Sequence, residues 1–353
     1  MIQIKLECGK DGEKRFMPTV TYQCPACGAP LRFDAETQQW ACDYCHVGYT
    51  QQELDHATGG REAAFHGVRY TCPTCGAELV TDENTAATFC LYCHSPTLLS
   101  ERLTDDFQPA GVIPFKISKE QAKEGFLKWC RSRKFVPNSF KSPDQIGKMT
   151  GLYVPYWLFD GSVEGKIQGL ATRVSSTRTG DEIVTRTRYY EVARSGSMAF
   201  AGVPADGSKK LDDQTMKVLE PFDYKGMHPF DASYLAGFFA EKYDVDKKAV
   251  SPNVEARIQG YAEQLLRNTI SGYATVNVNW RDIRLNNARA NYVLMPVWLL
   301  TYRTKGKDYL FLMNGQTGKI AGDMPFSFPK LFRFGAIAWA AITVLLAVFG
   351  YFF

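Results

Sequence analysis

Apolar and polar residues alternate along the middle of this chain in patterns typical of both helices and strands. Apolar side chains recur at helical spacing over residues 116–133, which predicts an amphipathic helix with Ser118 as its N-cap. Residues 231–244 and 253–271 have similar patterns and predict two more helices. Strands are predicted at residues 152–159, 163–174, 181–193, 274–284, 292–303 and 309–313. This mixture predicts an α+β domain of antiparallel strands and helices, which we place at residues 101–328.

Two further patterns predict how the strands of this domain pair. The segment PYWLFDGSVEGK (155–166) is similar to PVWLLTYRTKGK (296–307), with matching proline, tryptophan, leucine, glycine and lysine positions. Two related strand-turn-strand units are therefore expected in one antiparallel sheet. Residues 313–320, MNGQTGKI, place Asn-Gly and Thr-Gly turn signals between apolar runs and predict a hairpin.

The chain ends in an apolar run, residues 335–353, of 19 residues without a charged side chain. At about 1.5 Å per residue, such a helix is about as long as the hydrocarbon core of a bilayer is thick. A buried helix is the alternative, but a buried helix of this length normally shows a polar stripe, and this run shows none. We therefore predict a juxtamembrane segment and one transmembrane helix over residues 329–353.

Charged and aromatic side chains around this run predict its orientation. Lys330 and Arg333 precede the run, and Trp339 and Tyr351 suit the membrane interfaces. The N-terminal residues show no apolar run typical of a secretory signal. The positive-inside rule therefore predicts a single-pass protein of the cytoplasmic (inner) membrane, with its N-terminal domains in the cytoplasm.

Eight of the ten cysteines form a repeated motif near the N-terminus. CPACGAPLRFDAETQQWACDYCH begins at Cys24, and CPTCGAELVTDENTAATFCLYCH begins 48 residues later at Cys72. Tyr22 and Tyr70 also match at this spacing, so the two units are a tandem repeat. The predicted organisation is an N-terminal segment of residues 1–20, repeat units at residues 21–50 and 70–100, and a linker of residues 51–69 between them.

The spacing of these cysteines favours metal ligation over two alternatives. Disulfides need an oxidising compartment, and no signal sends this region across a membrane. Cys-x-x-Cys-His occurs twice, as in c-type haem attachment, but haem leaves the two CPxCGA halves unexplained. Tetrahedral zinc accounts for all eight thiols, and Gly28 and Gly76 permit the positive φ that such knuckle turns require. The predicted metal ligands are Cys24, Cys27, Cys42, Cys45, Cys72, Cys75, Cys90 and Cys93.

We therefore expect two tandem zinc ribbons, each with one structural Zn²⁺ in a closed four-cysteine site. Four protein thiolates leave no open position for catalysis, and a ribbon of about 30 residues needs the metal in order to fold. Iron bound to the same four sulfurs remains an alternative. His46 and His94 could replace a ligand but are expected to cap the knuckles or to lie exposed, and Cys8 and Cys130 are expected to be buried thiols.

The distribution of charge weighs against nucleic acid as the partner of the ribbons. Residues 1–100 contain 7 Lys and Arg against 12 Asp and Glu, and each zinc tetrathiolate adds a formal charge of about −2. Because phosphate binding requires clustered Lys and Arg, a protein partner fits this region better. A basic cluster further along the chain has two open interpretations, a solvated helix face or attraction to anionic lipid. That cluster consists of Lys116, Lys128, Arg131, Arg133, Lys134 and Lys141.

Motifs of common enzyme classes are missing from the sequence. NGQTGK (314–319) is too short for a phosphate loop, which needs four residues between its glycine and Gly-Lys, and Ile320 stands where Ser or Thr is required. The chain contains no G-x-S-x-G elbow and no H-E-x-x-H, and the histidines outside the repeats (His56, His66 and His228) are scattered. We therefore expect no enzymatic activity.

Several segments together resemble one bacterial family. The tandem CPxCGA and CxYCH motifs, VPYWLFDG, YLAGFFAEKYD, LFLMNGQTGKIAGDMP and the C-terminal apolar run are similar to the YdjG-type membrane proteins. These are TFIIB-type zinc-ribbon proteins, often labelled primosomal or replication-restart helicase-like, and the resemblance covers nearly the whole chain. It implies a membrane-integrated protein that works with stomatin/flotillin-like (SPFH) and phage-shock-protein-A-like proteins in envelope stress.

The residues themselves argue against the helicase label, because nucleotide-binding motifs are missing and the ribbons are acidic. We therefore expect a non-enzymatic adaptor or scaffold that recruits protein partners at the cytoplasmic face of the membrane. The alternative is a membrane-tethered nucleic-acid-binding accessory factor related to replication.

Overall fold

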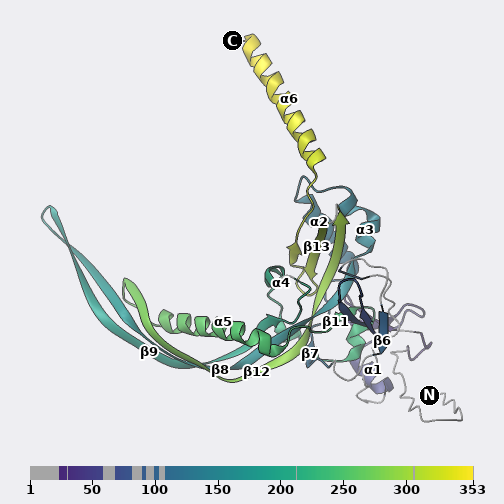
Figure 1. The fold of residues 1–353 in the computed structure, drawn as a ribbon, viewed down its shortest axis with the longest axis horizontal. Coiled ribbons are helices and arrows are strands. Elements are labelled where there is room, and N and C mark those ends of the chain that lie inside the picture. Colours follow the sequence, from purple (N-terminus) through teal and green to yellow (C-terminus); the bar gives the residue numbers. More distant parts are fainter. Residues whose placement is uncertain are drawn as a thin grey trace.

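The computed structural model describes residues 24–29, 31–58, 68–81, 90–92, 99–102, 108–211, 213–304 and 307–352. The described residues have a mixed α+β fold, as the sequence predicts. Figure 1 shows a body, a long curved β-arm that extends from it, and a helix, α6, that leaves the body on its own. The domain boundaries predicted from the sequence stay a prediction, and the N-terminal segment lies outside the described residues.

Three long antiparallel strands form the arm and continue into the body. They are β8 (Thr150–Thr179), β9 (Glu182–Asp206) and β12 (Thr275–Thr304). β8 lies between the other two. The sequence predicts two shorter strands in place of each of β8 and β12, and this prediction is wrong. In β12, a register shift between Asn286 and Arg289, with Asn287 at a φ of 52°, accommodates the polar stretch without ending the pairing.

Helix α5 (Lys247–Asn268) covers the concave face of the arm (Figure 1). Val163, Ile167 and Ala171 of β8 are buried, whereas the residues at alternate positions between them are exposed, as expected where one face of a strand is covered. Leu266 of α5 belongs to the same buried cluster as Ile167 and Ala171. The arm therefore has a small core of its own between α5 and the sheet.

The body is built around an 11-stranded sheet that includes β8 and β12. Its other strands include β7 (Gly111–Val112), β10 (His228–Pro229), β11 (Phe239–Glu241), β13 (Lys307–Asn314), β14 (Ile320–Gly322), β5 (Glu78–Thr81), β4 (Val68–Thr71) and β6 (Leu99–Arg102). β5 pairs with β11, so the hairpin of the second cysteine repeat extends the sheet of the body.

The pairing predicted for the two similar segments is confirmed in part, and the predicted hairpin is confirmed. The two similar segments lie on neighbouring antiparallel strands, with Pro296 opposite Tyr153 and Tyr292 opposite Trp157, although the first segment contains no turn. The predicted hairpin joins β13 to β14, with residue 313 opposite residue 320. Its turn is held by the side chain of Asn314, whose Oδ1 accepts the backbone N–H groups of residues 316 and 317 at 2.8 and 2.9 Å.

Local capping signals place two of the helices. In α2 (Lys119–Arg131), Ser118 Oγ accepts the N–H of Gln121 and the Gln121 side chain accepts the N–H of Ser118, which confirms the predicted helix and its cap. The helix predicted at residues 253–271 is α5, but it begins earlier because Asp246 caps it and Pro252 lies within it.

Shorter helices are α1 (Gln51–Thr58), α3 (Pro143–Gly147), α4 (Asp213–Leu219), and the 3₁₀ turns η1 (Ser139–Lys141), η2 (Tyr224–Gly226) and η3 (Ala232–Leu235).

The prediction of a helix at residues 231–244 is wrong. This segment forms η3 and strand β11, separated by Gly237 at a φ of 86°. β11 is buried between β8, with which it pairs in parallel, and β5, with which it pairs antiparallel. The apolar run of this segment therefore satisfies its backbone in the sheet, and this tertiary pairing overrides the helical spacing.

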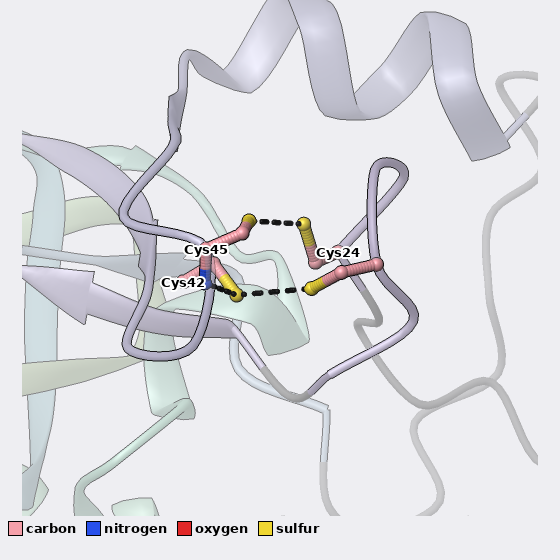
Figure 2. Close-up of side chains that lie close together, drawn as sticks. Cys24, Cys42 and Cys45 are labelled. Atoms are coloured by element: carbon pink, nitrogen blue, oxygen red, sulfur yellow. Dashed lines mark hydrogen bonds between the residues drawn. The ribbon is translucent and has the colours of Figure 1, made fainter.

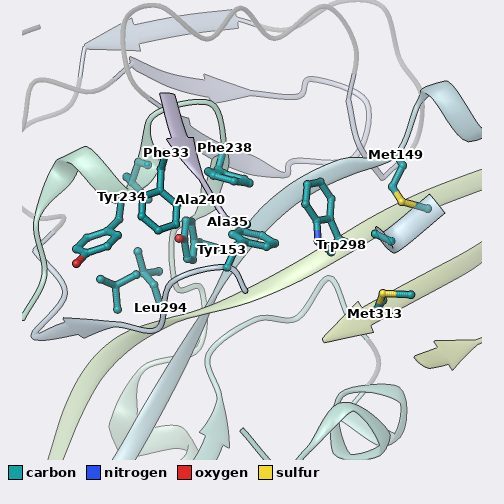
Figure 3. Packing of buried hydrophobic residues seen from close by; sticks show 14 of the residues in the cluster. Phe33, Ala35, Met149, Tyr153, Tyr234, Phe238, Ala240, Leu294, Trp298 and Met313 are labelled. Atoms are coloured by element: carbon teal, nitrogen blue, oxygen red, sulfur yellow. The ribbon is translucent and has the colours of Figure 1, made fainter. Parts of the chain in front are cut away.

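Aromatic side chains from distant segments pack together in the core of the body. The rings of Phe115 and Phe238 stack with centroids 4.3 Å apart, and Trp298 lies 4.9 Å from Phe115. Figure 3 shows Tyr153 and Phe238 close together in this cluster, with Phe33 and Tyr234 beside them. The core therefore includes residues of the first cysteine repeat.

Helix α6 (Phe328–Phe352) ends the described chain. Its segment Phe328–Leu346 is long and apolar enough to cross a membrane, and none of that segment is buried against the body. The side chains Phe332, Trp339 and Leu345 are among the most exposed apolar groups of the described residues. The length, composition and exposure of this helix agree with the predicted anchor.

Candidate metal centres

A small three-stranded sheet brings together the four cysteines of the first repeat. Its strands are β1 (Leu31–Asp34), β2 (Gln39–Cys42) and β3 (Gly48–Tyr49). The β1–β2 hairpin returns the chain so that the second knuckle lies beside the first. Cys24 Sγ lies 3.4 Å from Cys45 Sγ, and Cys27 Sγ lies 3.5 Å from Cys42 Sγ. Figure 2 shows the sulfurs of Cys24, Cys42 and Cys45 directed into a common space.

The same tight turn builds the first knuckle of each repeat. The N–H of Gly28 donates to Cys24 O at 2.8 Å, and the N–H of Gly76 donates to Cys72 O at 2.7 Å. Both glycines have a positive φ, 75° and 66° respectively, as the sequence predicts. In the second knuckle of the first repeat, His46 takes the corresponding position at a φ of 60°, and its side chain is exposed.

The second repeat gathers its described cysteines in the same way. Cys75 Sγ lies 3.6 Å from Cys90 Sγ, and the sulfurs of Cys72, Cys75 and Cys90 all lie within 4.8 Å of one another. Cys93 and His94, predicted as a ligand and a capping residue, lie outside the described residues, as does Cys8. Cys130, the other cysteine outside the repeats, is buried as predicted.

Both groups fit a tetrahedral metal ion. Four sulfurs at about 2.3 Å from a zinc ion lie roughly 3.8 Å from one another, and in each group the described sulfurs lie within 4.8 Å of one another. Thiolates without oxygen donors select zinc or iron rather than magnesium or calcium. Cys24, Cys42, Cys72 and Cys90 are buried, whereas Cys45 and Cys75 are half-buried and Cys27 is exposed. The two groups are therefore positioned to bind metal ions, and the donor set is consistent with zinc.

Hydrogen bonds prepare two of these thiols for metal binding. Burial alone would raise the pKa of Cys24, but the Tyr49 hydroxyl and backbone N–H groups that donate to its sulfur lower that pKa to about 6. The N–H groups of Cys45 and Tyr44 lower the pKa of Cys42. A thiolate is the form that ligates metal, so these contacts favour it at Cys24 and Cys42, whereas burial and the neighbouring sulfurs raise the pKa values of Cys27 and Cys45.

Each cysteine group is attached to the body by specific contacts. In the first group, Trp40 Nε1 donates to Ser233 O at 2.9 Å, and the rings of Phe33, Trp40 and Tyr234 lie 5.1–5.3 Å apart. In the second, Lys210 Nζ donates to Cys75 O at 2.6 Å. A metal ion bound in either group is therefore joined to the core of the protein through short chains of contacts.

A buried carboxyl group also contacts the second repeat. Glu241 of β11 is buried and accepts from the hydroxyls of Tyr92 and Ser208, both at 2.9 Å. Burial raises the pKa of Glu241 to about 8, although these two hydrogen bonds lower it in part. Glu241 could not be identified from the sequence, because it falls within the helix predicted at residues 231–244. A single glutamate in a helix does not indicate a buried carboxyl group.

The comparisons with known proteins give one relative of informative similarity. The chain is 41% identical over 313 residues to YdjG of Bacillus subtilis (strain 168), an uncharacterized protein, and the match covers 88% of this chain and 92% of the relative. The chain belongs to the YdjG family. No protein-family model matches it, and no solved structure matches it. The predicted YdjG-type resemblance is thus confirmed at the level of the family.

Proposed function

We propose that the chain is a non-enzymatic, membrane-anchored scaffold whose two cysteine groups are zinc ribbons that recruit protein partners at the cytoplasmic face of the membrane. The observation that carries this proposal is that an exposed cysteine knuckle is attached to the same body as an exposed apolar helix. A body anchored by α6 and presenting a rigid, exposed turn has the parts that a scaffold needs.

The second knuckle of the first repeat supplies the docking feature. Tyr44, between Cys42 and Cys45, is 80% exposed, and Val47 is 41% exposed. A metal ion would hold the turn rigid, so a partner that buries Tyr44 pays little conformational entropy for ordering it. Tyrosine is enriched at the centres of protein interfaces, whereas phosphate binding needs basic side chains. The knuckle therefore suits a protein partner, and we propose stomatin/flotillin-like or phage-shock-protein-A-like proteins.

The geometry of the described residues supports a non-enzymatic role. The groups of the 314–319 turn that a phosphate would need are used internally, since two of its N–H groups donate to Asn314 and Lys319 Nζ donates to Glu220 O. A pocket of about 490 Å³ beside β8 contains one carboxylate, Asp160. Both oxygens of Asp160 accept hydrogen bonds, from the N–H of Gly202 at 2.7 Å and from Asn291 Nδ2 at 3.1 Å. That carboxylate therefore serves to hold the neighbouring strands.

One observation favours the second candidate function, a membrane-tethered nucleic-acid-binding accessory factor. Beyond Thr172, the arm continues as a two-stranded ribbon of β8 and β9, and this ribbon carries exposed arginines. They are Arg173, Arg178, Arg186 and Arg188. A basic two-stranded ribbon can follow a groove of duplex DNA. Against this, Arg173 packs over Tyr190 and Tyr273, and Asp181 and Glu182 lie at the end of the ribbon.

Purification from detergent-solubilised membranes tests both candidates. We expect the full chain to retain a specific protein partner, and expect Tyr44→Ala to lose it while Tyr189→Ala, a matched change at a 73% exposed tyrosine on the arm, retains it. Retention of the full chain on a single-stranded DNA resin at about 0.15 M salt, abolished by Arg186→Gln and Arg188→Gln, would favour the accessory factor instead.

The cytoplasmic placement has its own test. Protease added to spheroplasts should leave the cysteine repeats intact and should digest them only after lysis. Cleavage of this region in unbroken cells would contradict a cytoplasmic scaffold.

A further inference from the structure

The helix α6 is fixed to the body at its first turn. The N–H of Ser327 donates to Phe135 O at 2.8 Å, and Lys330 Nζ donates to Val136 O at 2.6 Å and to Asn138 Oδ1 at 2.8 Å. These acceptors belong to the loop between α2 and η1, about 190 residues earlier in the chain. The helix is therefore held by a folded joint.

Aromatic contacts extend this joint along the axis of α6. Phe135 lies 5.6 Å from the ring of Phe326 and 5.8 Å from the ring of Phe334, so one side chain contacts α6 and the segment before it at points eight residues apart. Lys134 Nζ lies 5.7 Å from the centroid of Phe334. Contacts at two separated points restrain the direction of the helix as well as its position.

The loop of this joint is anchored in turn to the sheet. Ser139 Oγ and the Tyr302 hydroxyl are hydrogen-bonded at 2.7 Å, and Gln145 Nε2 donates to Thr301 O at 2.7 Å. The ring of Phe140 packs on Tyr302 with centroids 5.1 Å apart. One continuous surface of the body therefore contains the base of α6, the α2–η1 loop and the C-terminal end of β12.

Positive charge is concentrated on this surface. Residues 128–141 contain five Lys and Arg and no Asp or Glu, and residues 324–353 contain two more basic residues and no acidic one. Lys330 is used in the joint, which leaves six cations that we call the collar. The collar consists of Lys128, Arg131, Arg133, Lys134, Lys141 and Arg333. The fold thus joins two basic segments that are far apart in the sequence.

We propose that the collar binds the phosphate headgroups of anionic phospholipids and so fixes the orientation of the body relative to the bilayer. The proposal rests on the membrane anchoring of α6 in the proposed function. It favours the lipid interpretation of the basic cluster, because the segment that carries five of these cations contacts the base of the apolar helix. Lys and Arg near an anionic leaflet are attracted to it, whereas cations on an ordinary solvated face have no such neighbour.

The apolar side chains among the cations favour lipid over nucleic acid as the occupant. Phe326, Phe328, Phe332 and Phe334 are exposed at the base of α6. Aromatic rings interleaved with cations at the start of an apolar helix match the headgroup layer, where one side of the surface is wet and the other is hydrocarbon. A bilayer satisfies both the rings and the cations at once.

Hydrogen exchange of the full chain in nanodiscs tests the proposal. We expect amides of residues 128–141 to exchange at least about fivefold more slowly in discs that contain phosphatidylglycerol than in discs of phosphatidylcholine, since a fivefold change corresponds to about 1 kcal/mol, the attraction that a single cation near an anionic leaflet supplies. Lys128→Gln, Arg131→Gln and Arg133→Gln together, all outside the joint, should abolish the difference. The matched control Arg186→Gln with Arg188→Gln, two exposed cations on the arm, should preserve it.

Three results would overturn the collar. These are equal exchange in both kinds of disc, protection by inorganic phosphate alone in phosphatidylcholine discs, and protection there by a single-stranded oligonucleotide. Flotation of the discs reports the insertion of α6 separately. A chain that floats with both kinds of disc but exchanges equally in both contradicts the collar alone, and a chain that does not float contradicts the anchoring on which the collar rests.

Discussion

Individual cysteines of the two repeats belong to separate clusters, each held by its own knuckles. The sulfurs within each described group lie within 4.8 Å of one another, and the first group packs on η3 while the second extends the main sheet through β5. The two sites share no ligand among the described residues. Binding and loss of metal at one site should therefore proceed independently of the other.

Replacement of Cys24 by Ser tests this independence. We expect the wild-type chain to contain about two zinc ions by elemental mass spectrometry and Cys24→Ser to contain about one, because the three remaining thiolates leave an incomplete and weaker site. Cys130→Ser, a change at a buried thiol outside both groups, should retain two. Loss of both ions from Cys24→Ser would show that the sites are coupled.

The buried carboxyl of Glu241 predicts a dependence of stability on pH. Its pKa is raised from 4.5 to about 8 in the folded protein, mainly by burial. Between these two pKa values, the folded protein keeps the proton on Glu241 and the unfolded chain releases it. The stabilisation that Glu241 contributes is therefore complete below about pH 4.5 and is lost as the pH rises toward 8. Over the range from about pH 6 to about pH 8, this group alone should lower the free energy of unfolding by about 2 kcal/mol.

Glu241→Gln removes this titration and keeps an amide that can bond both hydroxyls. Denaturant unfolding of the wild type and the variant at several pH values should therefore show a smaller loss of stability with rising pH in the variant. Work above pH 6 keeps the thiolates metal-bound, which separates this effect from loss of zinc. Parallel pH profiles for the two proteins would show that Glu241 is ionised in the folded state.

At the scale of elements, the arm depends on α5. β12 accompanies β8 only as far as Thr275, opposite Thr172, and beyond that point β8 and β9 form a two-stranded ribbon. An isolated two-stranded hairpin is at best marginally stable, so the packing of α5 on the three-stranded part has to stabilise the arm. The arm is therefore expected to open locally before the body unfolds.

Leu266→Ala should destabilise the arm by about 2–5 kcal/mol, because Leu266 is 6% exposed and lies in the core between α5 and β8. The neighbouring Leu265→Ala, at a 55% exposed position, should change stability by less than about 0.5 kcal/mol. Hydrogen exchange should become faster in α5 and in residues 163–171, with the metal content of the cysteine groups unchanged. Faster exchange in the two cysteine groups as well would show that the arm and the body unfold as one unit.

At the scale of the whole molecule, the joint between α6 and the α2–η1 loop decides how the body is presented. Figure 1 shows that the far end of the arm curves toward the side of the body from which α6 leaves. A helix fixed at its base therefore keeps the arm in a constant orientation relative to α6, whereas a flexible tether would let the body rotate. The exposed knuckle with Tyr44 keeps a constant position relative to α6 for the same reason.

Removal of residues 335–353 should release the protein from membranes without disturbing its fold. None of the segment Phe328–Leu346 is buried, and the joint contacts of Ser327, Lys330 and Phe334 all precede the cut. We expect the shortened chain to remain in the supernatant after ultracentrifugation and to retain about two zinc ions, while the full chain sediments with the membranes. Loss of metal or aggregation of the shortened chain would indicate that the helix contributes to the fold.

Features that depend on a few neighbouring residues could be read from the sequence. The knuckle turns need a glycine with positive φ five residues into each CPxCGA motif, α2 needs Ser118 and Gln121 three residues apart, and the 313–320 hairpin needs its Asn-Gly turn. The apolar run of α6 needs only length and composition. Each of these is determined by the sequence alone, because backbone hydrogen bonding and turn geometry within a few residues leave little choice.

Features that join distant segments were decided only by the tertiary structure. Residues 231–244 have helical spacing, but burial between β8 and β5 makes Phe239–Glu241 a strand and places Glu241 against Tyr92 of the second repeat. The joint of Phe135 with Phe334 and the continuity of β12 through Asn287 have the same origin. In each case the local pattern is compatible with more than one conformation, and the burial of apolar surface against a partner more than 80 residues away selects one of them.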